Sequence, residues 1–282
     1  MTGSHMPKVS VLMTAYNRAE FIATAIESVL TSDFGDFELM IVDDGSKDAT
    51  VEIARGYEST DSRVKVYENP ENLGDYPNRN RAAYLARGEY LKYLDSDDAI
   101  YPWGLSVMVR CMDRFPQAGY GLSARSEFAR PHPVVFSPRE AYQEEYFGRE
   151  LFGRAPGSAI IRRAAFETVG GFSGMRQLGD FEFWHKIGAR YPLVSLPPAL
   201  SWDRVHPGQE KNTHSDVEKS AMRAEVVRAA LADPNCPLSE VEKERARKAI
   251  RRKYGRVFWR YLLRHGRPQD AFALRRSVIA RL

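Results

Sequence analysis

The sequence predicts an α/β fold, in which a mostly parallel sheet carries helices on both faces and a helical extension follows at the C-terminus. Two observations lead to this prediction. Over the first hundred or so residues, short apolar runs alternate with stretches whose apolar side chains recur at helical spacing, which is typical of right-handed βαβ units. Beyond His214 the pattern is helical to the end of the chain, with interruptions at 233–239 and 266–270.

The first part of the chain supplies the expected strands and helices of the parallel sheet. The strands are short runs rich in Val, Leu, Ile and aromatic residues, and they are expected at 8–13, 37–42, 63–68 and 89–94. The helices that connect them are expected at 19–32, near 47–58 and at 76–87.

The alternation stops near residue 120, and three later segments carry a pattern of their own. Residues 156–163 indicate another strand, residues 179–190 a helix, and residues 193–206 an extended segment. Residues 121–155 give no clear assignment.

The composition is that of a soluble, globular chain of one or two domains, since 43% of the 282 residues are hydrophobic and 28% are charged. No apolar run approaches the roughly 20 residues that a membrane-spanning helix needs, so the chain is not expected to cross a bilayer. Cys111 and Cys236 form no metal-binding or disulfide pattern and suit a cytoplasmic location. The stretch Gly3–Met6 (GSHM) is typical of a cloning remnant, so residues 1–6 are set aside.

Charge is distributed unevenly along the chain. Residues Val241–Leu282 hold 14 lysines and arginines against 3 acids, a charge of +11, whereas the whole chain has a net charge of +4. The 240 residues before this segment therefore carry −7. An acidic body is followed by a basic tail, and this asymmetry concerns partners rather than the fold.

Polar and acidic side chains follow three of the expected strands, at the point where each strand ends. Their sequences are TAYNR at 14–18, DDGS at 43–46 and DSDD at 95–98. In parallel α/β sheets, ligands bind beyond the carboxyl ends of the strands, where the strand order reverses. The crowded carboxylates of DSDD repel one another, which indicates a positively charged partner.

Two interpretations of these acidic motifs stay open when each is taken alone. Mg²⁺ and Mn²⁺ prefer oxygen ligands and are often held by one or two carboxylates together with substrate phosphates, which fits DSDD. Aspartate is also common at helix N-caps, and Asp-Gly is ordinary turn chemistry, so solvated turns fit both motifs.

The motifs are far more specific in combination and in order. VSVLMTAYNRAEFIATAIESVL, FELMIVDDGSKDAT and NLGDYPNRNRAAYLARGEYLKYLDSDD are followed by GSAIIRRAAFETVGGF, GDFEFWHKI and RVHPGQ. Over roughly residues 8–208, this series resembles the bacterial family-2 glycosyltransferases, which have the GT-A fold with a Rossmann-like sheet. The resemblance implies a glycosyltransferase domain at 7–212, with a nucleotide-binding half at 7–100 and an acceptor half at 101–212, and a basic extension at 213–282.

The resemblance places the nucleotide against the loop after the first strand. Thr14, Ala15, Tyr16 and Arg18 match the loop that holds the base and phosphates in the family. Tyr16 would stack on a pyrimidine, and a packed loop aromatic is the alternative for this residue.

Two further segments match nucleotide-binding positions of the family. Asp43 matches the residue that accepts a hydrogen bond from the pyrimidine N–H, and Asp44 lies beside it. Arg79 stands where the family has a basic residue near the base. The residue before it is Asn78, whereas the family commonly has alanine there.

DSDD corresponds to the metal-binding motif of the family. Asp95 would contact the ribose, Ser96 belongs to the nucleotide-binding set, and Asp97 would bind Mn²⁺ or Mg²⁺, with Asp98 as the alternative ligand. His206, in an Arg-x-His element after the last expected strand, would complete the metal site, although a lone histidine is usually no ligand.

The same resemblance assigns roles to the acceptor half. Arg204 would approach the phosphates, and Trp184 and His185 would either line the acceptor pocket or pack within the fold. Residues 121–155 are expected to shape the acceptor side.

The catalytic base implied by the resemblance is Asp180. Many relatives begin this helix with Glu-Asp, whereas this chain has Gly179-Asp180, so the first acid is missing and Glu182 is a weak substitute. The alternative is that Asp180 has no catalytic role and that its negative charge interacts favourably with the dipole at the N-terminus of the helix. The implied reaction is one in-line displacement: Asp180 takes the proton of an acceptor hydroxyl, whose oxygen attacks the anomeric carbon and inverts it.

The implied donor is a nucleoside-diphosphate sugar, with UDP favoured by the family. The acceptor would be a hydroxyl of a glycan or a lipid-linked sugar in bacterial polysaccharide or glycoconjugate synthesis. A sugar nucleotidyltransferase and a non-catalytic nucleotide-sugar-binding protein are the alternatives.

The basic tail leaves three interpretations open. Its apolar positions, Ile250, Tyr254, Val257/Phe258 and Tyr261/Leu262, recur at helical spacing. The helix would then pack on the body, or attach to anionic lipid at the inner face of the membrane, or form a homo-oligomer contact. No recognition motif supports binding of nucleic acid.

Overall fold

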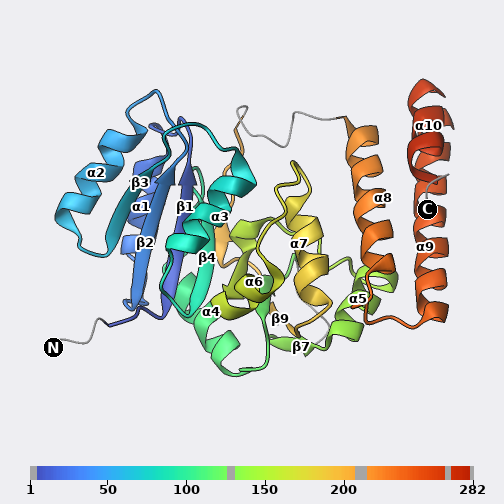
Figure 1. The fold of residues 1–282 in the computed structure, drawn as a ribbon, viewed down its shortest axis with the longest axis horizontal. Helices are drawn as coiled ribbons and strands as arrows, with labels where there is room; N and C mark the ends of the chain where they lie inside the picture. The colour runs from blue at the N-terminus through green and yellow to red at the C-terminus, as the bar shows by residue number, and fades with distance from the viewer. Residues whose placement is uncertain (1–4, 126–130, 207–214, 264–267, 280–282) are drawn as a thin grey trace.

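One eight-stranded sheet organises the computed structural model, which describes residues 5–125, 131–206, 215–263 and 268–279 (Figure 1). The strand order is β3-β2-β1-β4-β8-β6-β9-β7. These strands are β1 (Val9–Ala15), β2 (Phe37–Asp43), β3 (Val64–Glu68), β4 (Tyr90–Asp95), β6 (Tyr120–Ser123), β7 (Val134–Phe136), β8 (Ala159–Arg162) and β9 (Leu193–Leu196). A separate antiparallel ribbon pairs β5 (Ala99–Ile100) with β10 (Ser201–Trp202).

The four strands expected in the first part of the chain form the parallel half of the sheet. β2 and β3 extend to one side of β1, and β4 returns to pair with its other side. The strand order therefore reverses between β1 and β4, which is where such sheets bind their ligands. These four strands confirm the predicted α/β architecture.

The second half of the sheet is mixed. β8 lies antiparallel to both β4 and β6, whereas β6 lies parallel to β9. The expected strand at 156–163 is shorter, because a 3₁₀ turn at Pro156–Ser158 precedes β8. The extended segment at 193–206 contains β9 and β10 as two separate strands. β6 and β7 fall within or beside the unassigned region and were not predicted.

Helices cover both faces of the sheet, as the sequence predicted. α1 (Ile22–Leu30), α2 (Thr50–Thr60) and α4 (Gly104–Asp113) pack on one face. The opposite face is covered by α3 (Asp75–Leu85), α5 (Pro138–Phe147), α6 (Arg163–Val169) and α7 (Gly179–Gly188). The apolar side chains of each layer form their own buried cluster against the sheet.

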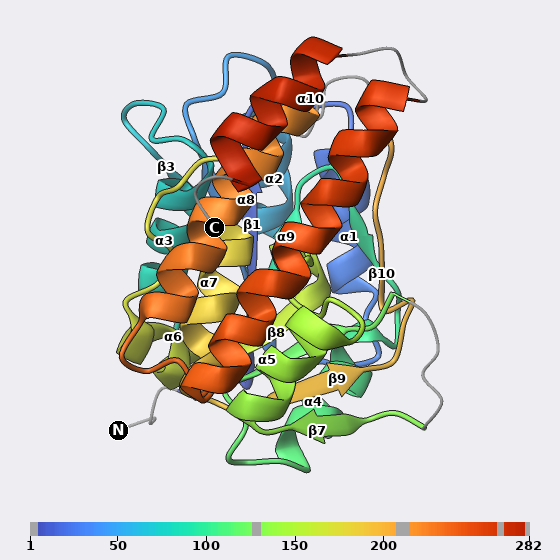
Figure 2. The same ribbon diagram turned by 90° about the vertical axis from the view of Figure 1, so that its right-hand side faces the viewer.

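The C-terminal extension continues the second of these layers. α8 (Asp216–Ala232) packs on α7, and α9 (Glu240–Leu263) packs on α5 and α10 (Pro268–Leu274), which a π-helical turn at Arg275–Ile279 follows. In Figure 2, α9 and α10 cross the face of the molecule that is turned toward the viewer. The expected boundary between residues 212 and 213 lies outside the described residues.

The apolar stripe of α9 packs inward. Ile250, Tyr254 and Phe258 are buried and belong to the same core cluster as α7. This confirms the packing interpretation for these side chains, whereas the side chain of Tyr261 lies outside the described part. Within the described residues, no helix combines the length and the apolar character needed to cross a bilayer.

Candidate active site

The predicted nucleotide-binding residues gather at the carboxyl edge of the parallel strands. Thr14 pairs with Asp95 across β1 and β4, and Ala15 pairs with Asp43 across β1 and β2. Ser96 follows β4 directly and is buried. The register of the sheet thus sets TAYNR, DDGS and DSDD side by side, as expected for strand ends that meet at one edge.

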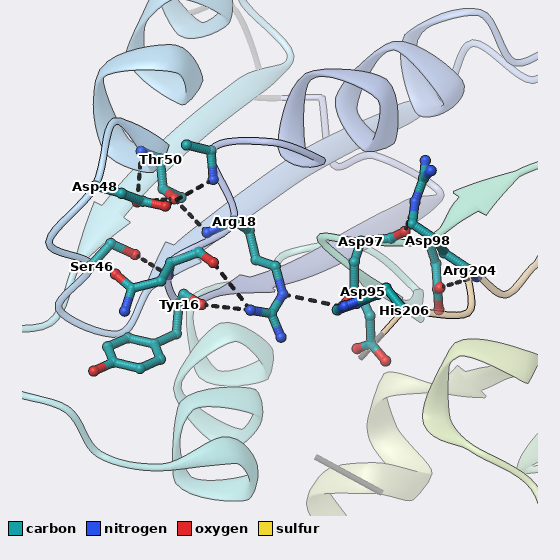
Figure 3. Close-up of polar contacts among 12 residues, drawn as sticks. Tyr16, Arg18, Ser46, Asp48, Thr50, Asp95, Asp97, Asp98, Arg204 and His206 are labelled. Carbon is teal, nitrogen blue, oxygen red and sulfur yellow. Dashed lines mark hydrogen bonds and ion pairs between the residues drawn. The ribbon is translucent and has the colours of Figure 1, made fainter. Parts of the chain in front are cut away.

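Hydrogen bonds from the DDGSKDAT segment hold the loop after β1 in shape (Figure 3). Asn17 has a φ of 52°, a conformation that asparagine tolerates. Its N–H donates to Ser46 Oγ at 2.8 Å, and its Oδ1 accepts from Lys47 N at 2.8 Å. The N–H of Arg18 donates to Thr50 Oγ1 at 2.7 Å. These supporting residues were not predicted from the sequence, although their polar side chains are typical of such loops.

Arg18 and Tyr16 leave this loop in different directions. The Arg18 guanidinium donates through Nη1 to the carbonyls of Tyr16 and Asn17, each at 3.1 Å, and through Nε to Asp97 Oδ2 at 3.1 Å. The Tyr16 side chain points away from this contact and 45% of the residue is exposed (Figure 3). The alternative of a packed aromatic at Tyr16 is therefore wrong, and its ring is available for stacking.

Asp43 is buried and shapes its own turn. Its Oδ2 accepts from the N–H groups of Gly45 at 3.0 Å and Ser46 at 2.8 Å, and its Oδ1 accepts from the Ser46 hydroxyl. The turn interpretation of DDGS therefore describes the contacts of Asp43. Its contact with a pyrimidine base stays a prediction.

Asp44 is buried as well and joins two loops. Its Oδ1 accepts from Asn69 Nδ2 at 2.6 Å and from Leu73 N at 2.8 Å, and its Oδ2 accepts from Gly74 N at 2.9 Å. Asp44 thus holds the segment that leads into α3. A direct contact with the nucleotide also stays a prediction for this residue.

Arg79 is buried and reaches the acidic cluster. It donates through Nε to Asp75 Oδ1 and through Nη2 to Asp95 Oδ1, both at 2.7 Å. The neighbouring Asn78 is buried too, and its Nδ2 donates to the Val42 carbonyl at 3.1 Å. Because that bond ties α3 to β2, it gives a physical reason for asparagine at the position where alanine was expected.

DSDD brings three carboxylates together. Asp95, Asp97 and Asp98 each offer an oxygen, and these oxygens lie within 4.8 Å of one another. His206 Nε2 lies 2.9 Å from Asp97 Oδ2, the same oxygen that Arg18 contacts. Burial, followed by the charge of Asp95, raises the pKa of Asp98 to about 7. A carboxylate–imidazole set of this kind fits Mn²⁺ or Mg²⁺.

Arg204 closes the cluster from the opposite side. Its N–H donates to Asp98 Oδ1 at 2.8 Å and its Nε to the Asp97 carbonyl at 2.9 Å. Its guanidinium lies over the rings of Phe21 and Trp202, with its carbon 5.0 and 4.8 Å from the two centroids. The Arg-x-His element thus brings both of its side chains to DSDD, while contacts of His206 with a metal and of Arg204 with phosphates stay predictions.

A buried lysine, missed by sequence analysis, lies on β4 below this cluster. Lys92 Nζ donates to the carbonyls of Tyr93, at 2.7 Å, and of Gly157. Burial lowers its pKa to about 8, against the attraction of the nearby aspartates. A lysine within an otherwise apolar strand was the sequence signal for this site.

Asp180 lies in the first turn of α7, facing α3. Its backbone N–H donates to the Tyr76 hydroxyl at 3.0 Å, and its Oδ1 accepts from Phe181 N at 2.6 Å. Burial raises the pKa of Asp180 to about 6, although the Phe181 N–H bond and the charges of Arg79 and Arg223 oppose this shift. A carboxylate with this pKa is ionised at neutral pH and takes up a proton more readily than an ordinary aspartate.

The position before Asp180 has no room for a side chain. A Cβ atom on Gly179 would lie 2.7 Å from Cε2 of the Tyr76 ring. This contact gives a physical reason for the missing acid of the Glu-Asp pair. Glu182, the weak substitute, accepts a hydrogen bond from Ser173.

Comparisons with known proteins place this geometry in a family. The profile described as "Glycosyl transferase family 2" matches residues 10–170, more than half of the chain. The chain belongs to glycosyl transferase family 2. This family-2 chain is 30% identical, over 189 residues, to the putative glycosyltransferase EpsE of Bacillus subtilis, and the match covers 63% of this chain and 66% of EpsE. Other curated relatives are matched over as little as 30% of their length.

Solved structures share the fold. A crystal structure of S. aureus TarS 1-349 in complex with UDP-GlcNAc superposes with a TM-score of 0.72 at 22% identity, over 94% of this chain and 79% of that one. The mannosyltransferase PcManGT of Pyrobaculum calidifontis, in complex with GDP-Man and Mn²⁺, gives 0.65 at 20% identity, over 96% and 74% of the two chains. These likenesses confirm the GT-A fold.

In this family-2 chain, Trp184 and His185 pack within the protein. Trp184 is buried, its ring stacks on Tyr120 with centroids 5.9 Å apart, and its Nε1 donates to the Arg154 carbonyl at 2.6 Å. His185 is buried among aromatic rings such as Phe181, and burial lowers its pKa to about 3. The packing interpretation, left open for both residues, is the one that the structure supports.

Proposed function

We propose that this chain is a metal-dependent inverting glycosyltransferase, which transfers a sugar from a nucleoside-diphosphate sugar, in the first place a UDP-sugar, to a hydroxyl of a glycan or lipid-linked acceptor. The process served would be bacterial polysaccharide or glycoconjugate synthesis, and the domain would span residues 7–212. One observation carries the proposal: the Asp97 carboxylate meets both His206 and Arg18 at the carboxyl edge of the sheet, beside two further carboxylates.

The donor would lie between the loop after β1 and DSDD. Asp97 and His206 would hold Mn²⁺ or Mg²⁺, with Asp98 as the alternative ligand, and the ion would offset the charge of the departing diphosphate. Arg18 and Arg204 lie beside these groups and would contact the phosphates. The exposed ring of Tyr16 would stack on the base.

The remaining nucleotide contacts are proposed for residues that are already ordered. Asp95, held by Arg79, would contact the ribose. Asp43 would accept a hydrogen bond from the base, and the backbone around Thr14, Ala15 and Ser96 would line the donor site. Because these groups are fixed by protein contacts, the donor would meet a preorganised site.

Asp180 would act as the base. Its carboxylate would take the proton of the acceptor hydroxyl while the hydroxyl oxygen attacks the anomeric carbon, and the bond to the diphosphate would break on the opposite side. General base catalysis contributes about 10²–10⁴-fold to such reactions. Arg79 donates a hydrogen bond to Asp95, and its positive charge lowers the pKa of Asp180. It therefore connects the proposed donor site with the proposed base.

Two solved structures with the same fold contain nucleotide sugars, which supports the proposed class of donor, but the bases of these nucleotides differ. TarS is in complex with UDP-GlcNAc, and PcManGT is in complex with GDP-Man and Mn²⁺. The base of the nucleotide therefore requires measurement. We further propose a cytoplasmic location and, from the basic extension, a peripheral contact with the inner face of the membrane, while homo-oligomer formation stays a prediction.

Calorimetric titration of UDP, dTDP and GDP, each with and without Mn²⁺, tests the donor site. We expect one diphosphate to bind the wild type in a metal-dependent way and Asp97→Ala to lose at least tenfold in affinity, since this change removes a proposed metal ligand. The matched control is Asp36→Ala, because Asp36 is exposed and precedes β2 at the other edge of the sheet. The absence of metal-dependent binding of any of the three nucleotides would contradict the proposal.

The alternatives predict different results in the same variants. A non-catalytic nucleotide-sugar-binding protein would bind the donor without transfer or donor hydrolysis. A sugar nucleotidyltransferase would release pyrophosphate from a nucleoside triphosphate and a sugar phosphate. Asp180→Asn should keep nucleotide binding and lose transfer only if Asp180 is the base.

A further inference from the structure

A basic cavity of about 390 Å³ lies in the half of the molecule that the donor site leaves free. Its wall includes the side chains of Arg125, Arg149 and Arg154, together with Ser123, Ser195 and Glu150. A volume of this size is within the range of small-molecule sites, roughly 300–1,000 Å³. None of these residues belongs to the predicted donor site or to the predicted base.

Ser123, in the cavity wall, lies at the same edge of the sheet as DSDD. β6 is antiparallel to β8 and β8 is antiparallel to β4, so β6 runs in the same direction as β4, and Ser123 is at its carboxyl end. Two strand spacings of roughly 4.8 Å separate β6 from β4. The Trp184 Nε1 bond to the Arg154 carbonyl, at 2.6 Å, anchors the cavity wall to α7, one turn after Asp180.

The cavity wall holds more positive than negative side chains, with three arginines and one acid. Glu150 is the acid among the lining residues, and its carboxylate pairs with Lys253 Nζ at 2.6 Å. Within the described residues, the buried Arg154 Nε and Ser123 Oγ atoms have no hydrogen-bond partner. Burial, followed by repulsion from Arg125, lowers the pKa of Arg154. The Arg154 guanidinium is half-buried, and an anion that contacts it would offset the cost of removing this charge from water.

A fourth cation connects the cavity to the proposed base. A Cβ atom on Gly153 would lie 3.2 Å from Arg125 Nη2 and 3.3 Å from Arg223 Nη2, so the two guanidinium groups flank this glycine. Arg223, from α8, also lies over the Phe181 ring at 3.9 Å from its centroid, next to Asp180. Its Nη2 pairs with Glu145 Oε1 at 3.6 Å, so Arg223 connects the cavity wall to the first turn of α7 while it shares its charge with that carboxylate.

We propose that this cavity binds an anionic group of the acceptor, a phosphate or a carboxylate, while a hydroxyl of the same molecule reaches Asp180. The inference rests on the proposed function and adds the chemical class of the acceptor. Guanidinium groups suit it because their paired N–H donors match the oxygens of phosphate and carboxylate. The anion comes either from the diphosphate of a lipid carrier or from phosphate or uronate units within a polyanionic glycan.

Binding of small anions without metal tests the cavity separately from transfer. Pyrophosphate, glycerol phosphate and glucuronate are titrated in the Asp97→Ala background, followed by NMR chemical shifts. We expect Arg154→Gln and Arg125→Gln each to weaken binding of the preferred anion at least tenfold, and Arg154→Lys to recover part of the loss. Arg114→Gln, an exposed arginine after α4, is the matched control. Thermal melting of every variant verifies that it is folded.

The comparison of the three anions distinguishes the two sources. Preference for pyrophosphate indicates a lipid diphosphate, and preference for glycerol phosphate or glucuronate indicates a polyanionic glycan. The proposal is overturned if no anion binds, or if folded Arg154→Gln and Arg125→Gln variants bind as the wild type does. Unchanged Mn²⁺-dependent nucleotide binding by the arginine variants of the otherwise wild-type chain keeps this result separate from failure of the proposed function.

Discussion

Asp180 illustrates how neighbours from distant parts of the chain set the chemistry of one residue. Burial against α3 raises the pKa of its carboxyl group, while Arg79 from α3 and Arg223 from α8 oppose the shift, and Asp75 adds to it. The result, a pKa of about 6, is higher than that of an ordinary aspartate and still below neutral pH. A base is most effective when its pKa is close to the working pH, so this environment favours the proposed role.

The pH dependence of transfer follows from this pKa. Because Asp180 acts in its ionised form, kcat/KM should fall about tenfold per pH unit below pH 6, instead of below pH 4 as for an ordinary aspartate. Asp180→Asn should lower transfer by about 10²–10⁴-fold and remove this limb of the profile. Steady-state rates between pH 4.5 and 8 measure both effects, with nucleotide binding followed at each pH to separate loss of the donor. A profile flat down to pH 5 would exclude Asp180 as the base.

The free energy of unfolding should also depend on the ionisation of Asp180. The contribution of Asp180 to it should fall as the pH rises, whereas the rate of transfer should increase. Since the folded-state pKa of Asp180 is raised, the folded protein binds more protons than the unfolded chain between about pH 4 and 6. The contribution of Asp180 therefore becomes less favourable as the pH rises through this window. Asp180→Asn should then melt at the same temperature as the wild type or higher at pH 7, so its loss of activity would not result from unfolding.

At the scale of single residues, the sequence predicted positions better than contacts. Asp97 and His206 lie together, as expected for residues that would share a metal, because their motifs each follow a strand that the sequence identifies. The Tyr76–Asp180 contact joins residues 104 positions apart and has no local signal. Trp184 and His185 likewise could not be assigned from α7 alone, because their surroundings come from other elements.

At the scale of elements, the first turn of α7 docks on α3 through Tyr76. The Tyr76 hydroxyl accepts from the Asp180 N–H, and its ring lies against Gly179 and packs on Phe172 with centroids 5.0 Å apart. An unpaired N–H at a helix start needs a partner, and here a neighbouring helix provides it. This close approach holds the proposed base beside Arg79.

Gly179→Ala tests whether that approach positions Asp180. The new Cβ would meet the Tyr76 ring at 2.7 Å, so the first turn of α7 must shift, at a cost of about 1–3 kcal/mol. We expect kcat to fall at least tenfold while metal-dependent nucleotide binding changes little. Gly255→Ala in α9 is the matched control, because a Cβ there meets no atom within 4 Å. Wild-type kcat in a destabilised Gly179→Ala variant would show that the contact serves stability alone.

Elements were predicted from the sequence where they are long or regular, and missed where they are short. β1, β2 and β4 are almost entirely buried, and β3 at the sheet edge alternates buried and exposed residues, whereas β6 and β7 have four and three residues. β6 gains its pairing from β8 and β9, which are distant in the sequence, so its strand character comes from the sheet and not from local preference. The cavity proposed for the acceptor is lined by β6, by β9 and by residues 149–154.

At the scale of the whole molecule, the acidic and the basic parts of the sequence form different parts of the structure. The 240 residues before Val241 carry a net charge of −7, and the basic tail contributes α9 and α10 at one end of the ribbon (Figure 1). α9 buries its apolar stripe, so its arginines face outward: Arg252, Arg256 and Arg260 are exposed, as are Trp259 and Leu263. Exposed basic, aromatic and aliphatic side chains on one helix face are typical of attachment to anionic lipid surfaces.

Co-sedimentation with vesicles of phosphatidylglycerol and phosphatidylcholine tests this proposed attachment. Each basic residue near an anionic surface contributes about 1 kcal/mol, so Arg256→Gln/Arg260→Gln should weaken vesicle binding at least tenfold. Salt should weaken wild-type binding as well, because the interaction is screened over roughly 10 Å at 0.1 M. Arg110→Gln/Arg114→Gln removes the same charge from the exposed side of α4 and should leave vesicle binding unchanged.

If both double variants lose affinity equally, net charge alone explains the binding. If the wild type ignores anionic vesicles at low salt, the outward face of α9 is a solvated surface, and the acceptor must reach Asp180 without help from the membrane.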